Sequence, residues 1–120
     1  MKSPLLIAVM ATLLLGVCSA HCSPVRGQYR AKERLEAGRN LEYRETFRAN
    51  ERACVIIEGD HNPVMNLKVR VLDPAGNTIA SDLSGGDLLV VTWYPARTQE
   101  YTITISSDGD TYNILNIVLK

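Results

Sequence analysis

From Leu41 onward, apolar and polar residues alternate along the chain in short runs. Leu41, Tyr43 and Phe47 are separated by charged and hydroxyl-bearing residues, and the stretch "EYTITIS" repeats the same period of two. This is the period of a β-strand with one buried face. Turn residues separate seven or eight such runs up to the C-terminus. The pattern predicts an all-β domain over residues 41–120, folded as an antiparallel β-sandwich.

One hairpin of this sandwich is predicted by the stretch "VRVLDPAGNTIASD". Asp73 can accept hydrogen bonds from nearby backbone amides, Pro74 presets φ at the next position, and Gly76 can take a positive φ. Together these residues predict a type I turn closed by a glycine bulge. Asp73 and Asp82 stand on either side of the turn, where two carboxylates could also form a metal site or a catalytic pair. We interpret both as turn residues.

The stretch "DLLVVTWYP" departs from alternation. Its aliphatic run, residues 88–91, is typical of a strand covered on both faces, and Pro95 ends it. Trp93 shares a face with two aliphatic residues of the run and is predicted to lie in the core. Tyr94 points to the opposite face, so we consider it a candidate for a stacking contact with a ligand.

The first forty residues have a different composition. Lys2 precedes an apolar run that ends at Val17, and small residues flank a cleavage position after Ala20, which predicts a secretory signal peptide over 1–20. The run is shorter than the ~20 residues that a membrane-spanning helix needs, so we expect no membrane span after cleavage. Residues 21–40 are interpreted as a basic stem, either coil or a short helix.

The cysteines near the N-terminus raise two further questions, lipid attachment and disulfide formation. The stretch "LLGVC" resembles a lipobox, but Val17 stands where a small residue is required, so lipid attachment at Cys18 is the minor alternative. Cleavage leaves Cys22 and Cys54, which in an oxidising compartment are predicted to form a disulfide. A zinc site is not predicted, because the two histidines and two cysteines lack paired-ligand spacing.

The net charge is zero, but it is distributed unevenly. Residues 24–52 carry eight Arg or Lys against five Glu, whereas 53–120 carry four against eight Asp or Glu. Nucleic-acid binding requires a basic surface on the folded part of the chain. The acidic balance of the predicted sandwich therefore argues against a nucleic-acid partner.

The loops contain the candidate catalytic and metal-binding residues. His61, beside Asp60, is the only histidine of the sandwich, and no nucleophile motif accompanies it. We therefore predict a protein that is not an enzyme and keep Asp60 and His61 as ligand-binding candidates. Calcium is the most plausible metal, because acidic residues lie in or beside the turns. Those considered as its ligands are Asp73, Asp82, Asp108 and Asp110.

Residues from about Leu41 to Leu119 resemble the bacterial pre-peptidase C-terminal domain. The resemblance is carried by "ETFRANERACVIIEGD", "NLKVRVLDPAGNTIASD" and "WYPARTQEYTITIS". It implies a jelly-roll-like sandwich that acts as a non-catalytic accessory or binding module. Where the family often has Asp-Leu-Asp, this chain has Asn66-Leu67-Lys68, which places a positive charge at a position of the family's metal ligands.

These observations lead to one main functional hypothesis. We expect an exported, non-catalytic module that binds cell-envelope polysaccharide or another secreted protein through a sheet face or loops. Two alternatives stay open: a purely structural envelope protein, and a calcium-dependent polysaccharide-binding module.

Overall fold

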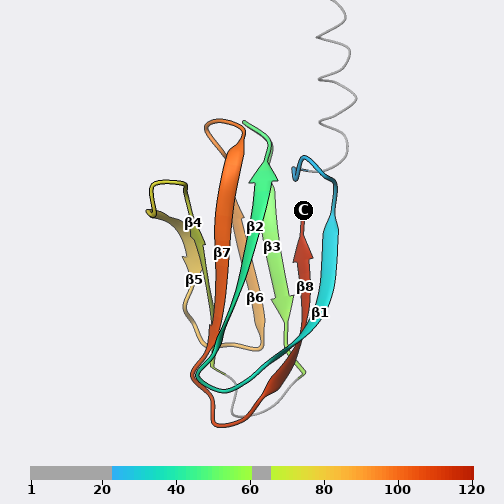
Figure 1. Cartoon of the computed structure of the whole chain (residues 1–120), viewed down its shortest axis with the longest axis vertical. Coiled ribbons are helices and arrows are strands. Elements are labelled where there is room, and N and C mark those ends of the chain that lie inside the picture. The colour runs from blue at the N-terminus through green and yellow to red at the C-terminus, as the bar shows by residue number, and fades with distance from the viewer. Residues whose placement is uncertain (1–22, 61–65) are drawn as a thin grey trace, which may run out of the picture.

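The computed structural model describes residues 23–60 and 66–120, which form two antiparallel sheets packed face to face (Figure 1). The strands are β1 (Tyr29–Leu35), β2 (Asn40–Phe47), β3 (Ala53–Glu58), β4 (Leu67–Leu72), β5 (Thr78–Asp82), β6 (Leu88–Trp93), β7 (Gln99–Ser107) and β8 (Asn113–Leu119). One sheet, the β1 sheet, has the order β1-β8-β3-β6, and the other, the β2 sheet, has the order β2-β7-β4-β5. The prediction of an all-β antiparallel sandwich is confirmed.

The core lies between the sheets and is built from every second residue of the strands. In β4, Leu67, Val69 and Val71 are fully buried, whereas the intervening Lys68 and Arg70 point away from the core. This alternation is the period of two that the sequence displays. Burial of the aliphatic rows from both sheets is the main stabilising contribution to the fold.

An aromatic cluster closes one end of the core. Trp93 is 8% exposed, and its ring centroid lies 4.9 Å from that of Phe47 and 5.4 Å from that of Tyr101, both in tilted edge-on arrangements. Such geometries are favoured by the quadrupoles of aromatic rings. The prediction that Trp93 belongs to the core is confirmed.

The predicted β4–β5 hairpin is also confirmed. The N–H of Gly76 donates to the carbonyl of Asp73 at 2.9 Å, and the N–H of Asp73 donates to the carbonyl of Asn77 at 2.9 Å. Gly76 has a φ of 89°, which a residue with a Cβ rarely adopts. The pairing register shifts between Val71 and Leu72, beside the turn.

The prediction of a coil or short helix within residues 21–40 is wrong for the segment that forms β1. This strand pairs with β8 along its whole length, as Figure 1 shows. Before it, Ser23–Val25 pairs with β2, and the chain then crosses between the sheets at Gly27, which has a φ of 91°. The folded domain therefore includes residues from Ser23, not only from Leu41. The predicted signal peptide and its cleavage after Ala20 fall outside the described residues.

The prediction that β6 is covered on both faces is wrong as well. Leu89 and Val91 are buried, but Leu88 and Val90 are 60% and 50% exposed. The reason is that these two side chains point to the outer face of the β1 sheet, which no other described strand covers. No helix in the described part of the chain is long and apolar enough to cross a membrane.

Candidate functional site

Asp73 and Asp82, two of the four acidic residues proposed as calcium ligands, are engaged by neighbouring residues. Asp73 accepts hydrogen bonds from the N–H groups of Ala75 and Asn77 at 3.0 and 2.9 Å, and the backbone bond from Asn77 is the main reason that its pKa is lowered. Asp82 accepts hydrogen bonds from the hydroxyl and the N–H of Ser84 at 2.7 and 3.1 Å, and these lower its pKa too. Both carboxylates thus stabilise turns, as interpreted from the sequence.

Asp108 binds a cation of the chain itself. Its Oδ2 lies 2.8 Å from Nζ of Lys68, the residue that replaces a carboxylate of the resembling family. The N–H of Asp108 donates to the carbonyl of Asn66, just before β4, whereas Asp73 follows the other end of β4. The two acids are therefore about one strand length, ~20 Å, apart. Within residues 23–60 and 66–120 no group of three His, Cys, Asp or Glu side chains is placed to hold a metal ion.

The predicted ligand-binding residues do not form one site. Tyr94 is 67% exposed and follows the end of β6, which pairs with the start of β3. Asp60 follows the end of β3, where its N–H donates to Oδ1 of Asn113 at 3.1 Å. Tyr94 and Asp60 thus lie at opposite ends of the β1 sheet. His61 is outside the described residues, so its role stays a prediction.

Cys54 is 5% exposed and its thiol is free in the structure. Burial raises its pKa, which disfavours the reactive thiolate. Cys22 falls outside the described residues, and the Cys22–Cys54 disulfide therefore stays a prediction. Intact-mass measurement of the exported protein with and without reductant tests it, since reduction of a disulfide adds two hydrogens.

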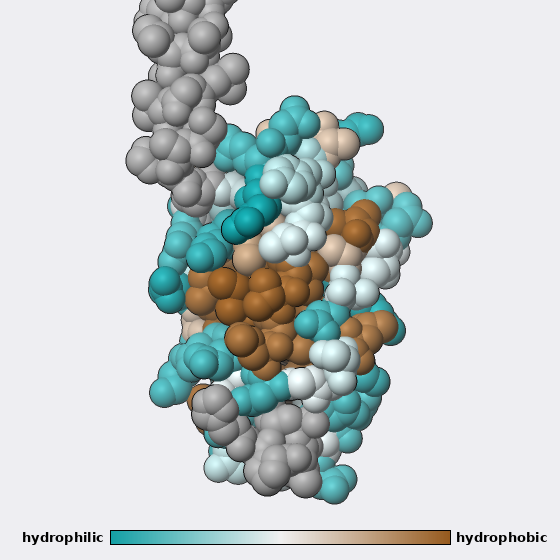
Figure 2. Space-filling model, turned by 180° about the vertical axis from the view of Figure 1, so that it is seen from behind, coloured by the Kyte–Doolittle hydropathy of each residue, from teal (hydrophilic) through white to brown (hydrophobic). Residues whose placement is uncertain are grey.

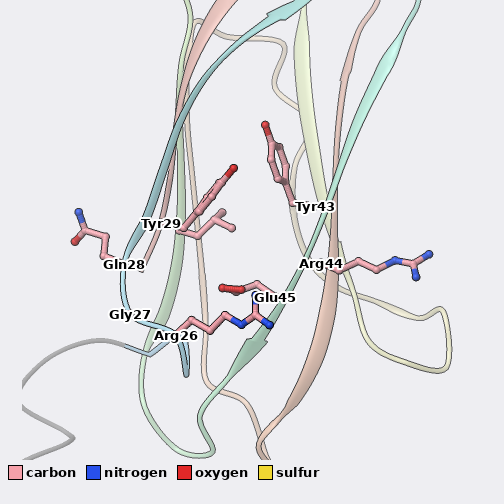
Figure 3. A pocket seen from close by; sticks show the side chains of 8 residues that line it. Arg26, Gly27, Gln28, Tyr29, Tyr43, Arg44 and Glu45 are labelled. Atoms are coloured by element: carbon pink, nitrogen blue, oxygen red, sulfur yellow. The ribbon is translucent and has the colours of Figure 1, made fainter.

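A groove lies where the edge strands of the two sheets, β1 and β2, face each other. Its volume is about 270 Å³, and it is lined by Arg26, Tyr29, Tyr43, Arg44 and Glu45, with Leu119. Figure 3 shows the rings of Tyr29 and Tyr43 facing each other across the groove and Arg26 beside Glu45, whereas the side chain of Arg44 extends away. The two tyrosine ring centroids are 5.9 Å apart.

The polar groups of this groove are partly withdrawn from water. Burial raises the pKa of Tyr43 to about 12, with a smaller effect from the charge of Glu33, and the buried Tyr43 hydroxyl has no hydrogen-bond partner among the described residues. Burial also raises the pKa of Glu45, while the positive charge of Arg26 opposes this rise. A buried hydroxyl without a partner is costly to the folded protein.

A second hollow of about 260 Å³ continues the groove. It shares Arg26, Arg44 and Glu45 with the first and extends to Thr46 and Glu100. The two hollows therefore adjoin at Arg26 and Glu45, along β2.

The sequence interpretation missed this groove. Tyr43 and Glu45 were recognisable as residues on the inward face of β2, because they alternate with outward-pointing residues of the same strand. Arg26 and Tyr29 were assigned to a stem, and only the pairing of β1 with β8 brings them opposite β2.

A second surface feature is the outer face of the β1 sheet, where apolar residues gather in the centre of the view in Figure 2. Val118, Ile56 and Val90 are in register on β8, β3 and β6, so they form one row across three strands. Arg30 on β1 extends this row, because it is paired with Val118. The outer face therefore has an aliphatic centre with a cation at the β1 side.

Neither the family models nor the curated proteins that were searched match this sequence. Several solved structures share its fold, including the following two. The pre-peptidase C-terminal domain of collagenase from Bacillus anthracis matches with a TM-score of 0.66 at 10% identity, covering 78% of this chain and 89% of that domain. PliG, a periplasmic inhibitor of g-type lysozyme from Aeromonas hydrophila, matches with a TM-score of 0.55 at 9% identity, covering 82% of this chain and 86% of that one. The resemblance to the pre-peptidase C-terminal domain is thus confirmed for the fold.

Proposed function

We propose that the protein is an exported, non-catalytic binding module that holds an uncharged stretch of cell-envelope polysaccharide in the groove between β1 and β2. The observation that carries the proposal is the pair of tyrosine rings, Tyr29 and Tyr43, in the lining of the groove. The apolar face of a sugar ring can stack on an aromatic face.

The size and charge of the groove support a neutral oligosaccharide. About 270 Å³ is close to the lower end of the ~300–1,000 Å³ range of small-molecule sites, which suits one sugar unit in each hollow. Arg26 and Glu45 carry opposite charges side by side, so the centre of the groove does not favour a polyanion. Because the two hollows adjoin along β2, an internal segment of a polymer can occupy both of them.

The fold supports the non-catalytic part of the proposal. Structures that share it include the pre-peptidase C-terminal domain of a collagenase and an inhibitor of g-type lysozyme. The carboxylates of Asp73, Asp82 and Asp108 are bound within their own turns or by Lys68, so these three are engaged in structural contacts. The predicted signal peptide supports export.

The proposal is tested by titrating the isotope-labelled protein with N-acetylglucosamine tetrasaccharide, cellotetraose and tetragalacturonate, and then with isolated envelope polysaccharide. We expect a neutral oligosaccharide to shift the amide signals of residues 26–29 and 43–46. Tyr29→Ala should weaken its binding by up to about tenfold, as expected for the loss of one aromatic contact. Chelators should have no effect on binding.

Tyr94→Ala is the matched control, because Tyr94 is also an exposed tyrosine but lies away from the groove. It should bind as the unaltered protein does. Equal losses in Tyr29→Ala and Tyr94→Ala, or the absence of groove shifts with every glycan, would refute the proposal. The second outcome would favour a purely structural envelope protein.

A further inference from the structure

The strand β1 has a free edge. It is the first strand of its sheet and pairs only with β8 among the described strands. In an antiparallel pair, the N–H and C=O groups of every second residue bond to the neighbour, and the others point the opposite way. Part of the backbone of this seven-residue strand is therefore available for pairing with another chain.

The outward side chains of β1 are all cationic. Arg30, Lys32 and Arg34 alternate with inward-pointing residues and are exposed. Arg34 is bonded to Glu36 and stacked on the ring of Tyr112, 3.7 Å from its centroid. Within residues 23–60 and 66–120, neither Arg30 nor Lys32 has an acidic partner, so two charges of the stripe are uncompensated.

A shallow hollow of about 290 Å³ lies beside these two cations. It is lined by Arg30 and Lys32 on β1 together with Asn116 and Val118 on β8. Carboxylates of a neighbouring strand could reach into this hollow. Beyond it, the aliphatic row of Val118, Ile56 and Val90 begins.

We propose that the free edge of β1 docks an extended acidic segment of another exported protein, which adds to the β1 sheet as a fifth strand. Its backbone bonds to the free N–H and C=O groups of β1, and carboxylates at every second position lie beside Arg30 and Lys32. Cross-strand pairs of opposite charge are favourable, whereas like charges directly opposite are unfavourable.

The same charge pattern excludes a second copy of this chain as the occupant. Antiparallel pairing of two β1 strands about Lys32 would set Lys32 against Lys32 and Arg30 against Arg34. The stripe thus blocks self-pairing and selects an acidic strand. This site does not depend on the groove, because the cations point to the outer face and Tyr29 points to the inner one.

The probe is the capped peptide Thr-Glu-Val-Glu-Val-Glu-Thr, added to the exported protein purified after expression of the full chain. We expect slower amide hydrogen exchange at alternate residues of β1, since only those facing the free edge gain a bond. Lys32→Glu should weaken peptide binding roughly five- to tenfold, from the loss of an attractive pair and the gain of a repulsive one. A peptide with Lys in place of the central Glu should recover binding to this variant.

Arg70→Glu is the matched control, because it makes the same charge change on the outer side of β4 in the other sheet. It should bind the acidic peptide nearly as the unaltered protein does. Two further probes are a peptide with the same residues in the order Glu-Glu-Glu-Thr-Thr-Val-Val and polygalacturonate. If either binds as tightly as the alternating peptide does, the interaction is charge attraction alone and the proposal is overturned. Sedimentation showing a dimer that Lys32→Glu dissociates would overturn it too. Tyr29→Ala separates the two sites, because it removes a ring from the groove and should weaken glycan binding while peptide binding stays unaltered.

Discussion

Leu35→Ala tests whether the N-terminal strand is part of the folded unit. Leu35 ends β1, is paired with Asn113 of β8, and is 1% exposed. Replacing a buried leucine with alanine typically costs about 3–5 kcal/mol, from lost burial and the cavity left behind. For a domain of this size, each kcal/mol lowers Tm by about 4–8 °C. We therefore expect a fall in Tm of at least about 12 °C.

The assay is thermal and urea unfolding followed by circular dichroism, with Leu83→Ala as the control. Leu83 is 46% exposed, so the same chemical change there should alter the free energy of unfolding by less than about 0.5 kcal/mol. If Leu35→Ala lowers stability no more than Leu83→Ala does, then β1 is a dispensable stem. In that case the groove and the docking edge both lose their structural basis.

Two further predictions concern the acidic loops. The pKa of Asp73 is lowered in the folded state, chiefly by the hydrogen bond from the backbone amide of Asn77. The contribution of the Asp73 carboxylate to the free energy of unfolding is therefore complete above the ordinary pKa of an aspartate, and it is lost as the pH falls through the pKa of the folded state. The difference in urea midpoint between the unaltered protein and Asp73→Ala should therefore narrow under acidic conditions, and a difference that widens there would contradict this. Since Lys68 already neutralises Asp108, millimolar calcium should raise Tm by less than about 2 °C relative to chelator. A ligand at a hundred times its Kd would add ~2.7 kcal/mol to the free energy of unfolding, which corresponds to a rise in Tm of roughly 10 °C or more.

The fold could be predicted from the sequence because most strands carry one apolar and one polar face. β4 and β7 alternate strictly, and the hairpin turn carries residues whose conformational preferences agree with it. Two strands were misjudged for opposite reasons. The charges of β1 suggested a helix or a tether, although they alternate with Tyr29, Ala31 and Leu35. The aliphatic run of β6 suggested burial on both faces, although Val90 is exposed on the outer face of the sheet.

The candidate site was less accessible to sequence reasoning, because it depends on which strands end up at the sheet edges. Tyr94 stood out locally as an aromatic residue pointing away from the core, and the structure does place it on the surface. Tyr29 and Tyr43 have no such local signal. Their proximity results from two separate pairings, β1 with β8 and β2 with β7, which bring the edges of different sheets together.

The alternation of β1 is the structural basis of the two binding roles that we propose for this strand. Its inward residue Tyr29 faces the groove, while its outward residues Arg30 and Lys32 face the docking edge. Because these side chains project from opposite faces of the sheet, substitutions on one face should leave the other ligand's affinity unchanged. Lys32→Glu should weaken binding of the acidic peptide only, and Tyr29→Ala should weaken binding of the glycan only. Loss of both ligands in Lys32→Glu, with an unaltered Tm, would show that the groove and the edge form a single site.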